Sequence, residues 1–431
     1  MPLKAMRLAG AALALYLFAG HAPAVAQGGR PEHWVGTWAT AVVARPQATL
    51  VAGRGPAPAP LNFNNQTLRQ IVHTSLGGDR VRIVLSNAFG TMPLPVGAAS
   101  VALRQKESSI VVASKRQLTF GGATATTVAA GAIAVSDPVN LAVPAFADLA
   151  IDIFLPGDTA ALPSPLTTHN GALQTSYISA AGNHVGEGDW TSPSTMQAWF
   201  FLSSVDVAAP DNVGAVVAFG DSITDGTLST PDTNNRWPDH LARRLMMQAT
   251  ANRAPQSMLG VLNEGIAGNR ILSEFVGPSA LARFDRDVLA QSGVTHIILL
   301  EGINDLGLGG NGQPLPSAAE IIAGHRQIIE RAHAHGLKVV AGTFLPFEGT
   351  NLGAIAPGYY STDKDMRRQA VNEFIRTSRA YDGVIDFEAA VRDPGHPLQL
   401  LAPFKGADNL HLTDAGYRAM AATVNLALLR R

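Results

Sequence analysis

Residues 215–226 read AVVAFGDSITDG, a short apolar run followed at once by a polar segment that contains two glycines. A continuous apolar run of this length, ended by turn-forming residues, is typical of a strand buried on both faces of a parallel sheet. Similar runs recur along the rest of the chain. Including the first, they lie at 215–219, 258–262, 296–300, 337–343 and 384–387.

Helical stretches separate these runs, at 237–250, 317–335, 365–381 and 414–429. The alternation of strands and helices predicts a doubly wound α/β domain with a parallel sheet of about five strands. In such sheets ligands bind outside the carboxyl ends of the strands, at the point where the strand order reverses. The residues that follow each strand are therefore the place to look for chemistry.

In the N-terminal half the apolar residues have a different spacing. Residues 80–86, RVRIVLS, alternate between polar and apolar, and the turn-forming Gly-Gly-Asp of 77–79 precedes them. Further short β-rich runs lie at 68–76, 100–103, 110–112, 149–154 and 196–205. They predict an all-β sandwich or jelly-roll-like domain. With a linker at 208–212, we expect an accessory β domain over 27–207 and an α/β domain over 212–431.

The first 26 residues have the layout of a secretory signal peptide. Lys4 and Arg7 precede an apolar run at 8–20, and small residues follow up to an expected cleavage site after Ala26. The run is shorter than the roughly 20 residues that a membrane-spanning helix needs. We therefore expect a secreted or periplasmic protein without integral membrane association after cleavage.

Composition excludes several classes of protein. Hydrophobic residues make up 46% of the 431 residues, enough for packed cores, so disorder is excluded for most of the chain. The 32 Lys and Arg are balanced by 33 Asp and Glu, which leaves no basic footprint for nucleic acid. Cysteine is absent from the sequence, which rules out thiol nucleophiles, Cys-ligated zinc and disulfides.

Four polar, glycine-bearing or acidic segments follow the predicted strands, at 220–226, 263–270, 301–305 and 408–411. Their positions would bring a Ser, a His and a nearby Asp to the same edge of the sheet. Acyl transfer needs a nucleophile, a base that takes its proton and a group that orients the base. Ser222, His411 and Asp408 fit these three roles, and Asp408 stands three residues before His411.

Acyl transfer also needs hydrogen-bond donors for the oxyanion that develops on the substrate. The backbone N–H of Ser222 faces the same site, and Gly268 can expose its own N–H because no Cβ blocks a close approach. Asn304 adds a side-chain amide. We expect these three groups to form the oxyanion hole.

The four segments resemble the conserved blocks of the SGNH/GDSL hydrolase superfamily of esterases and lipases. The matching residues are Gly-Asp-Ser at 220–222, Gly268, Gly-Ile-Asn-Asp at 302–305 and Asp-Asn-Leu-His at 408–411, in family order. The resemblance covers roughly residues 214–431. It implies a flavodoxin-like fold and ester hydrolysis without a cofactor, by the triad and oxyanion hole just named.

The N-terminal half is similar to the β-rich region that precedes this domain in a bacterial branch of the superfamily. The segments that carry this similarity are WVGTWA at 34–39 and RVRI at 80–83. The chain is therefore expected to be an exported serine esterase for short-chain acyl or acetyl esters. A lipase or lysophospholipase is an alternative that uses the same residues.

Other active sites fit the sequence less well. An α/β-hydrolase elbow would have glycine where Thr224 stands, and a phosphatase using Asp221 would have an acid where Ile223 stands. The Ser-x-x-Lys pattern at 361–364 lacks the partner motifs of penicillin-binding enzymes. Asp386, which ends the fifth predicted strand, is an alternative to Asp408 as the group that orients His411.

Histidine spacing gives no metal site. His333 and His335 are two positions apart, so on a helix they point in different directions, whereas shared ligation favours a separation of four. Core or surface roles are expected for His73, His169 and His184 in the β-rich half. No metal or other cofactor is expected.

Two loops are placed to shape a substrate site. Residues 306–316 hold four Gly and two Pro, and residues 346–362 carry aromatic side chains. The candidates for lining the site are Asp221, Asp305, Phe347 and Tyr359.

A hypothesis of a different class gives the main role to the β-rich half. Trp34, Trp38, Trp190 and Trp199 would then provide stacking platforms for a polysaccharide, and the enzyme would be a carbohydrate deacetylase.

Overall fold

The computed structural model describes residues 32–45, 62–161, 164–191, 193–251, 258–310, 312 and 314–430. The expected signal peptide at 1–26 lies outside these residues. From His33 to Arg431 the chain forms one compact unit, so the boundary at 208–212 stays a prediction. Across the part that is described, no helix combines the length and the apolar character that crossing a membrane requires.

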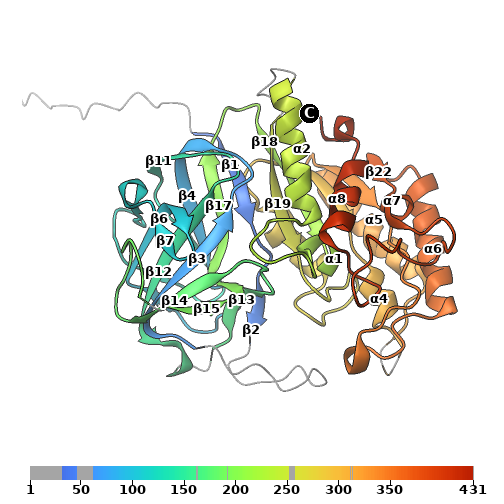
Figure 1. Cartoon of the computed structure of the whole chain (residues 1–431), viewed down its shortest axis with the longest axis horizontal. Helices are drawn as coiled ribbons and strands as arrows, with labels where there is room; N and C mark the ends of the chain where they lie inside the picture. The colour runs from blue at the N-terminus through green and yellow to red at the C-terminus, as the bar shows by residue number, and fades with distance from the viewer. Residues whose placement is uncertain are drawn as a thin grey trace, which may run out of the picture. The chain divides into compact units, whose positions relative to one another are not determined.

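The C-terminal half contains a parallel sheet of five strands, as predicted (Figure 1). In sheet order the strands are β19 (Leu259–Gly265), β18 (Gly214–Gly220), β20 (Val294–Leu300), β21 (Lys338–Gly342) and β22 (Gly383–Ile385). The chain thus starts at β18, adds β19 on one side and builds the other three strands outward on the other side, which is the flavodoxin-like order. Every residue of β18 is buried, which explains its unbroken apolar sequence.

Two groups of helices accompany this sheet. In one group, α2 (Trp237–Ala251) packs against α8 (Asp414–Thr423), which also contacts α7 (Phe387–Val391). In the other, α5 (Ala318–Ala334) packs against α6 (Thr362–Thr377) and α3 (Ala280–Phe284). The shorter turns are α1 (Ser222–Asp225), the π-helical turn η4 (Asp285–Leu289), α4 (Ile303–Gly307), η5 (Gly353–Ile355) and η6 (Leu426–Leu429).

Capping residues determine several helix and strand boundaries that differ from those predicted from sequence periodicity. The predicted helix at 365–381 begins at Thr362, because the Ser361 side chain accepts a hydrogen bond from the Lys364 backbone. The fifth predicted strand extends to 387, but β22 ends at Ile385, because Asp386 caps α7. The helical segment over α3 and η4 is too short for its periodicity to predict it.

The N-terminal half is antiparallel, and α-helices are absent from its described residues up to Ala208. One sheet joins β1 (Trp34–Ala39), β17 (Leu202–Ala208), β4 (Gly78–Ser86), β10 (Ile133–Val135) and β11 (Val139–Val143). A second joins β15 (Ser194–Met196), β14 (Ser176–Ala181), β3 (Asn64–His73), β12 (Asp148–Asp158), β6 (Ala98–Lys106), β7 (Ser109–Ile110) and β8 (Arg116–Gln117).

Smaller elements complete this half. A three-stranded sheet contains β16 (Ala198–Phe200), β13 (Leu166–Asn170) and β2 (Val43–Arg45), and a two-stranded one contains β5 (Leu94–Val96) and β9 (Thr126–Val128). Two 3₁₀ turns are η1 (Val112–Ser114) and η2 (Thr159–Ala161). The two large sheets share one apolar core, which includes Ile83 of β4 and Ile151 of β12. This sandwich agrees with the expected fold class.

The β-rich half contacts the parallel sheet directly at its edge strand. Strand β1 packs against β19, and Thr40 forms a parallel bridge with Asn263. The Val261 N–H donates to the Ser75 hydroxyl at 3.0 Å. Val35 of β1 also belongs to the same apolar cluster as the strands of the parallel sheet. These contacts make the two halves one compact unit.

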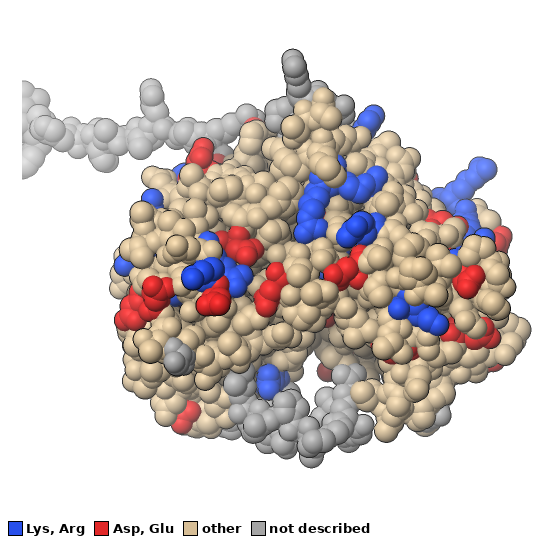
Figure 2. All heavy atoms as spheres, in the orientation of Figure 1, with Lys and Arg blue, Asp and Glu red and all other residues tan. Residues whose placement is uncertain are grey.

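On the face of the molecule drawn in Figure 2, acidic and basic side chains are interspersed among a larger uncharged surface. Several basic side chains gather at the upper centre of this face, and elsewhere on it the two signs are mixed. This pattern matches the near balance of charges in the sequence.

Candidate active site

Three side chains from distant parts of the chain form a continuous hydrogen-bonded series. Ser222 is the first residue of α1, directly after β18 and Asp221, and its Oγ lies 2.8 Å from His411 Nε2. His411 Nδ1 lies 2.5 Å from Asp408 Oδ2. If Nδ1 carries the proton that the carboxylate accepts, Nε2 is left as an acceptor for the Ser222 hydroxyl. The arrangement can move a proton from Ser222 to His411.

Asp408 is held as a carboxylate. Partial burial opposes its ionisation, but the hydrogen bond and charge of His411 and the backbone N–H groups of His411 and Leu410 outweigh burial and lower the Asp408 pKa to about 2. Asp408 Oδ1 accepts from these two N–H groups at 2.9 and 3.0 Å. The carboxylate is therefore both charged and fixed in position near neutral pH.

Asp386, the alternative partner for His411, is occupied elsewhere. Its carboxylate accepts hydrogen bonds from Thr343 and Arg376, and from the Ala389 N–H as the cap of α7. The Nδ1 atom of His411 contacts Asp408 instead.

The expected oxyanion donors follow three neighbouring strands. Ser222 comes after β18, Gly268 after β19 and Asn304 after β20, and β18 lies between the other two. Gly268 has φ of +80°, a left-handed conformation that glycine adopts without strain. The Nδ2 atom of Asn304 is buried and has no hydrogen-bond partner within the described residues. A buried amide without a partner is costly unless a ligand supplies the acceptor.

Tyr359 sets the orientation of the Asn304 amide. Its hydroxyl donates to Asn304 Oδ1 at 2.8 Å, which leaves Nδ2 as the free end. Burial raises the Tyr359 pKa well above its ordinary value, so the hydroxyl keeps the proton that it donates. This role was missed in the sequence, where Tyr359 was a candidate for lining the substrate site.

Phe347, the other aromatic candidate, is fully buried. Its ring meets Tyr359 and Tyr360 edge-on, with centroids 6.0 and 5.2 Å away. Phe347 and Tyr359 therefore support the site from within, and neither presents an open surface in this structure.

The two acidic candidates are also part of the framework. Asp221 accepts a hydrogen bond from the Ile223 N–H at 2.9 Å, and burial raises its pKa to about 7. Asp305 accepts from the N–H groups of Ile271 and Leu272, and burial raises its pKa to about 6. Asp305 thus ties the loop after β19 to α4, which carries Asn304.

Arg283 joins the ends of the three strands that carry the candidate site. Its buried guanidinium donates to the carbonyls of Gly220 and Glu264 and to the Asn269 side chain, at 2.9, 2.8 and 3.0 Å. It also contacts the Glu301 carboxylate at 3.5 Å. Arg283 was not predicted from the sequence. The available signal was an arginine inside the apolar segment 280–284.

The two histidines that were weighed as a metal pair have ordinary partners. His333 contacts the Asp382 carboxylate, and His335 contacts the Arg331 carbonyl. Over the stretches that the structure describes, no group of three or more His, Cys, Asp or Glu is arranged to hold a metal ion.

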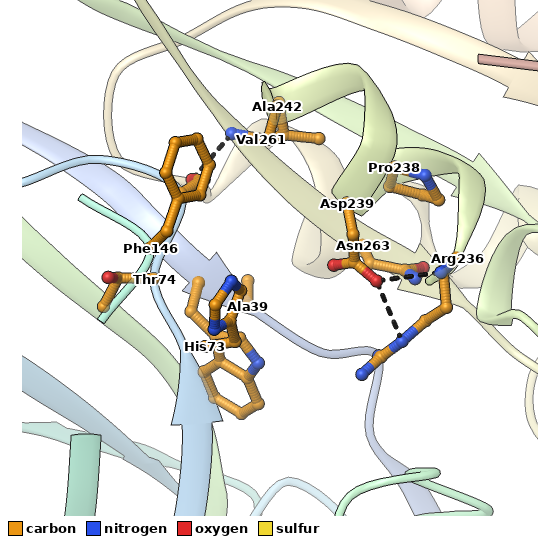
Figure 3. Close-up of a pocket in the computed structure, with 12 residues that line it drawn as sticks. Ala39, His73, Thr74, Phe146, Arg236, Pro238, Asp239, Ala242, Val261 and Asn263 are labelled. Atoms are coloured by element: carbon orange, nitrogen blue, oxygen red, sulfur yellow. Dashed lines mark hydrogen bonds and ion pairs between the residues drawn. The ribbon is translucent and has the colours of Figure 1, made fainter. Parts of the chain in front are cut away.

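A cavity of about 30 Å³ lies where β1 and β3 meet α2 and β19 (Figure 3). His73 and Phe146 face it from one side, and the ion pair of Arg236 and Asp239 from the other. It has room for only a few waters, and its lining does not include the Ser222 site. This cavity is not where an ester would meet the proposed nucleophile.

The tryptophans are mostly unavailable as stacking platforms. Trp38, Trp190 and Trp199 are at least 92% buried. Trp34 is partly exposed, and the Arg82 guanidinium covers its ring at 4.6 Å. The aromatic surface required by a polysaccharide-binding role is therefore lacking at these four positions.

Residues 218–419 match the model of the GDSL-like lipase/acylhydrolase family. A GDSL-like lipase from Bacteroides thetaiotaomicron VPI-5482 is 19% identical, with a TM-score of 0.36 over 52% of this chain and 91% of that chain. The inhibitor-bound aryl esterase of M. smegmatis is 14% identical, with a TM-score of 0.38 over 50% of this chain and 96% of that chain. No curated protein matches the sequence.

Proposed function

We propose that the chain is a serine esterase with Ser222 as nucleophile, on the premise that residues 218–419 match the model of the GDSL-like lipase/acylhydrolase family. The observation that carries the proposal is the series from Ser222 Oγ through the two ring nitrogens of His411 to Asp408. It supplies the nucleophile, the base and the group that orients the base.

In the first step His411 Nε2 takes the hydroxyl proton as Ser222 Oγ attacks the carbonyl carbon of the ester. The π electrons of the carbonyl move to its oxygen, which becomes an oxyanion. When this oxygen re-forms the double bond, the bond to the alcohol oxygen breaks and His411 gives the proton to the leaving alcohol. The acyl group is then bonded to Ser222.

The oxyanion is stabilised by the N–H groups of Ser222 and Gly268 and by Asn304 Nδ2. Donors that are already in place act where charge develops and need no rearrangement during the reaction, and loss of one such donor costs about 10²–10³ in kcat. The unpartnered state of Asn304 Nδ2 supports its assignment to this role.

In the second step water replaces the alcohol. His411 Nε2 takes a proton from water, whose oxygen attacks the acyl carbon, and then returns the proton to Ser222 Oγ as the acid leaves. Asp408 holds the imidazole in the same tautomer in both steps and stabilises the imidazolium that forms.

Carboxylic esters with short acyl or acetyl groups are the proposed substrates. The chain has a net charge of −1. This near balance favours uncharged esters over polyanions. We further propose that the protein is exported by its first 26 residues.

A panel of p-nitrophenyl esters of increasing chain length, together with acetylated sugars, tests this function. Ser222→Ala should lower kcat by on the order of 10⁴-fold or more. Ser273→Ala, which alters an exposed serine on the loop after Gly268, is the matched control and should keep its activity. Retention of wild-type activity by Ser222→Ala would refute the assignment. A maximum at long acyl chains would instead favour a lipase or lysophospholipase.

A further inference from the structure

The β-rich half holds the turn that carries Ser222. His169, in β13, places its Nε2 3.1 Å from Oδ1 of Asp225, the last residue of α1. The other oxygen of Asp225 accepts a hydrogen bond at 3.2 Å from the backbone of Ala267. Ala267 directly precedes Gly268. A side chain from the β-rich half is thus linked through one carboxylate to both the nucleophile turn and the proposed oxyanion loop.

Both ring nitrogens of His169 face acceptors. Nδ1 lies 2.8 Å from the carbonyl oxygen of Ala41, and Nε2 faces the Asp225 carboxylate. A neutral imidazole has a single N–H, so one nitrogen would turn a lone pair toward an acceptor. The imidazolium has two N–H groups and satisfies both contacts. The geometry therefore favours the charged form of His169.

The surroundings of His169 agree with this charge. Complete burial acts to lower the His169 pKa, but the Asp225 carboxylate and the Ala41 carbonyl outweigh it, so the pKa is raised above its ordinary value. The positive charge of nearby Arg236, like burial, acts to lower the His169 pKa. Tyr417 of α8 also lies near Asp225, and burial, with a contribution from that carboxylate, raises the Tyr417 pKa, so this residue stays neutral.

A second contact holds the segment after α1 to the same part of the β-rich half. The Asp232 carboxylate accepts hydrogen bonds from the Thr175 N–H, the Thr175 hydroxyl and the Gln174 side chain, at 2.6, 2.7 and 2.7 Å. The Asp232 N–H donates to the Leu173 carbonyl. The chain that follows Ser222 is therefore fixed at Asp225 and again at Asp232.

We propose that His169, as an imidazolium, is a positioning residue for ester hydrolysis: through Asp225 it holds the Ala267–Gly268 backbone where Gly268 can donate to the oxyanion. This inference rests on the proposed function. It gives the β-rich half a part in catalysis that does not depend on binding substrate.

We expect kcat to depend on pH on the alkaline side. A histidine with a raised pKa keeps its proton below that pKa and loses it as the pH rises through it. Deprotonation of His169 removes one N–H and loosens Asp225. The wild-type kcat should therefore fall on the alkaline side.

Two substitutions separate the charge of His169 from its packing. In His169→Gln a single uncharged amide nitrogen replaces two ring nitrogens that face different acceptors, so at least one contact is lost. The variant should lower kcat about ten- to a hundredfold with KM within about twofold, the size expected for a lost hydrogen bond to a charged group. In Asp225→Asn the amide oxygen can accept from Ala267 while Nδ2 donates to Nε2 of a neutral His169. This variant should keep most of its kcat and lose the alkaline decline.

His184→Gln is the matched control. His184 also lies in the β-rich half and has a raised pKa, because of its hydrogen bond to Glu187, and it is partly exposed. Its kcat and alkaline decline should equal those of the wild type.

The measurement is kcat and KM for p-nitrophenyl acetate from pH 6 to 10, with thermal unfolding of each variant. The proposal is overturned if His169→Gln keeps the wild-type kcat, or if Asp225→Asn keeps the alkaline decline. The Asp225→Asn result decides the question even if His169→Gln fails to fold. Failure of the proposed function looks different, because Ser222→Ala would then hydrolyse the ester as fast as the wild type.

Discussion

One hydroxyl determines which end of the Asn304 amide is free to bind an oxyanion. Tyr359→Phe removes that hydroxyl and leaves the ring packing in place. We expect kcat to fall about two- to tenfold, since a neutral hydrogen bond contributes roughly 0.5–1.5 kcal/mol. Asn304→Ala, which deletes the donor itself, should lower kcat by about 10²–10³-fold.

Tyr360→Phe controls for the loss of a phenol from the same loop, because the Tyr360 ring also packs on Phe347. Steady-state kinetics with one ester are enough. Equal kcat values for Tyr359→Phe and the wild type would show that Tyr359 does not orient the amide.

At this scale the sequence predicted residues that lie in short motifs and missed residues outside the motifs whose partners are distant in the sequence. Asp408 and His411 are three positions apart, so their pairing could be anticipated. Tyr359 and Asn304 are 55 positions apart, and His169 and Asp225 are 56 apart. Such pairs are created by tertiary packing, and neither composition nor periodicity indicates them.

Among the elements, α3 contributes the residue on which the strand ends depend most. Arg283 is fully buried beside Asp287 and Glu301, and it binds the carbonyls at the ends of β18 and β19. Arg283→Met would leave the buried Glu301 without its cation and the strand-end carbonyls without their donor, while Asp287 would keep its ion pair with Arg286. We expect the free energy of unfolding to fall by about 3–5 kcal/mol.

Arg331→Met is the comparison for this prediction, because Arg331 pairs with Asp285, whose side chain is 71% exposed. An exposed pair contributes about 1 kcal/mol or less. Urea unfolding of the two variants gives both values. Equal decreases in the free energy of unfolding for Arg283→Met and Arg331→Met would contradict the role assigned to Arg283.

The strands of the parallel sheet were predictable because each is a short apolar run that ends in turn-forming residues. The ends of strands and helices were less predictable. The end of β22 depends on Asp386, which caps the next helix, and the start of α6 depends on the Ser361 hydroxyl. The helical segment from α3 into η4 is short and includes a π-helical turn, so it lacks the repeated spacing that identifies longer helices.

In the whole molecule, the spacing of apolar residues changes near residue 208, where the β sandwich ends and the α/β half begins. Both halves belong to one compact unit. Composition and periodicity indicate the sandwich and the parallel sheet. They do not indicate that β1 packs against β19, or that β13 reaches Asp225. These contacts depend on complementary surfaces. The role proposed for the β-rich half therefore depends on contacts that only the three-dimensional arrangement shows.

Labelling with a fluorophosphonate tests whether the protein forms an acyl-enzyme on Ser222. Intact-mass and peptide spectra should show one adduct, on the peptide that contains Ser222, and none on Ser222→Ala. His411→Ala should react far more slowly, because no base takes the hydroxyl proton. An adduct of equal yield on Ser222→Ala, or on a different serine of the wild type, would contradict the account.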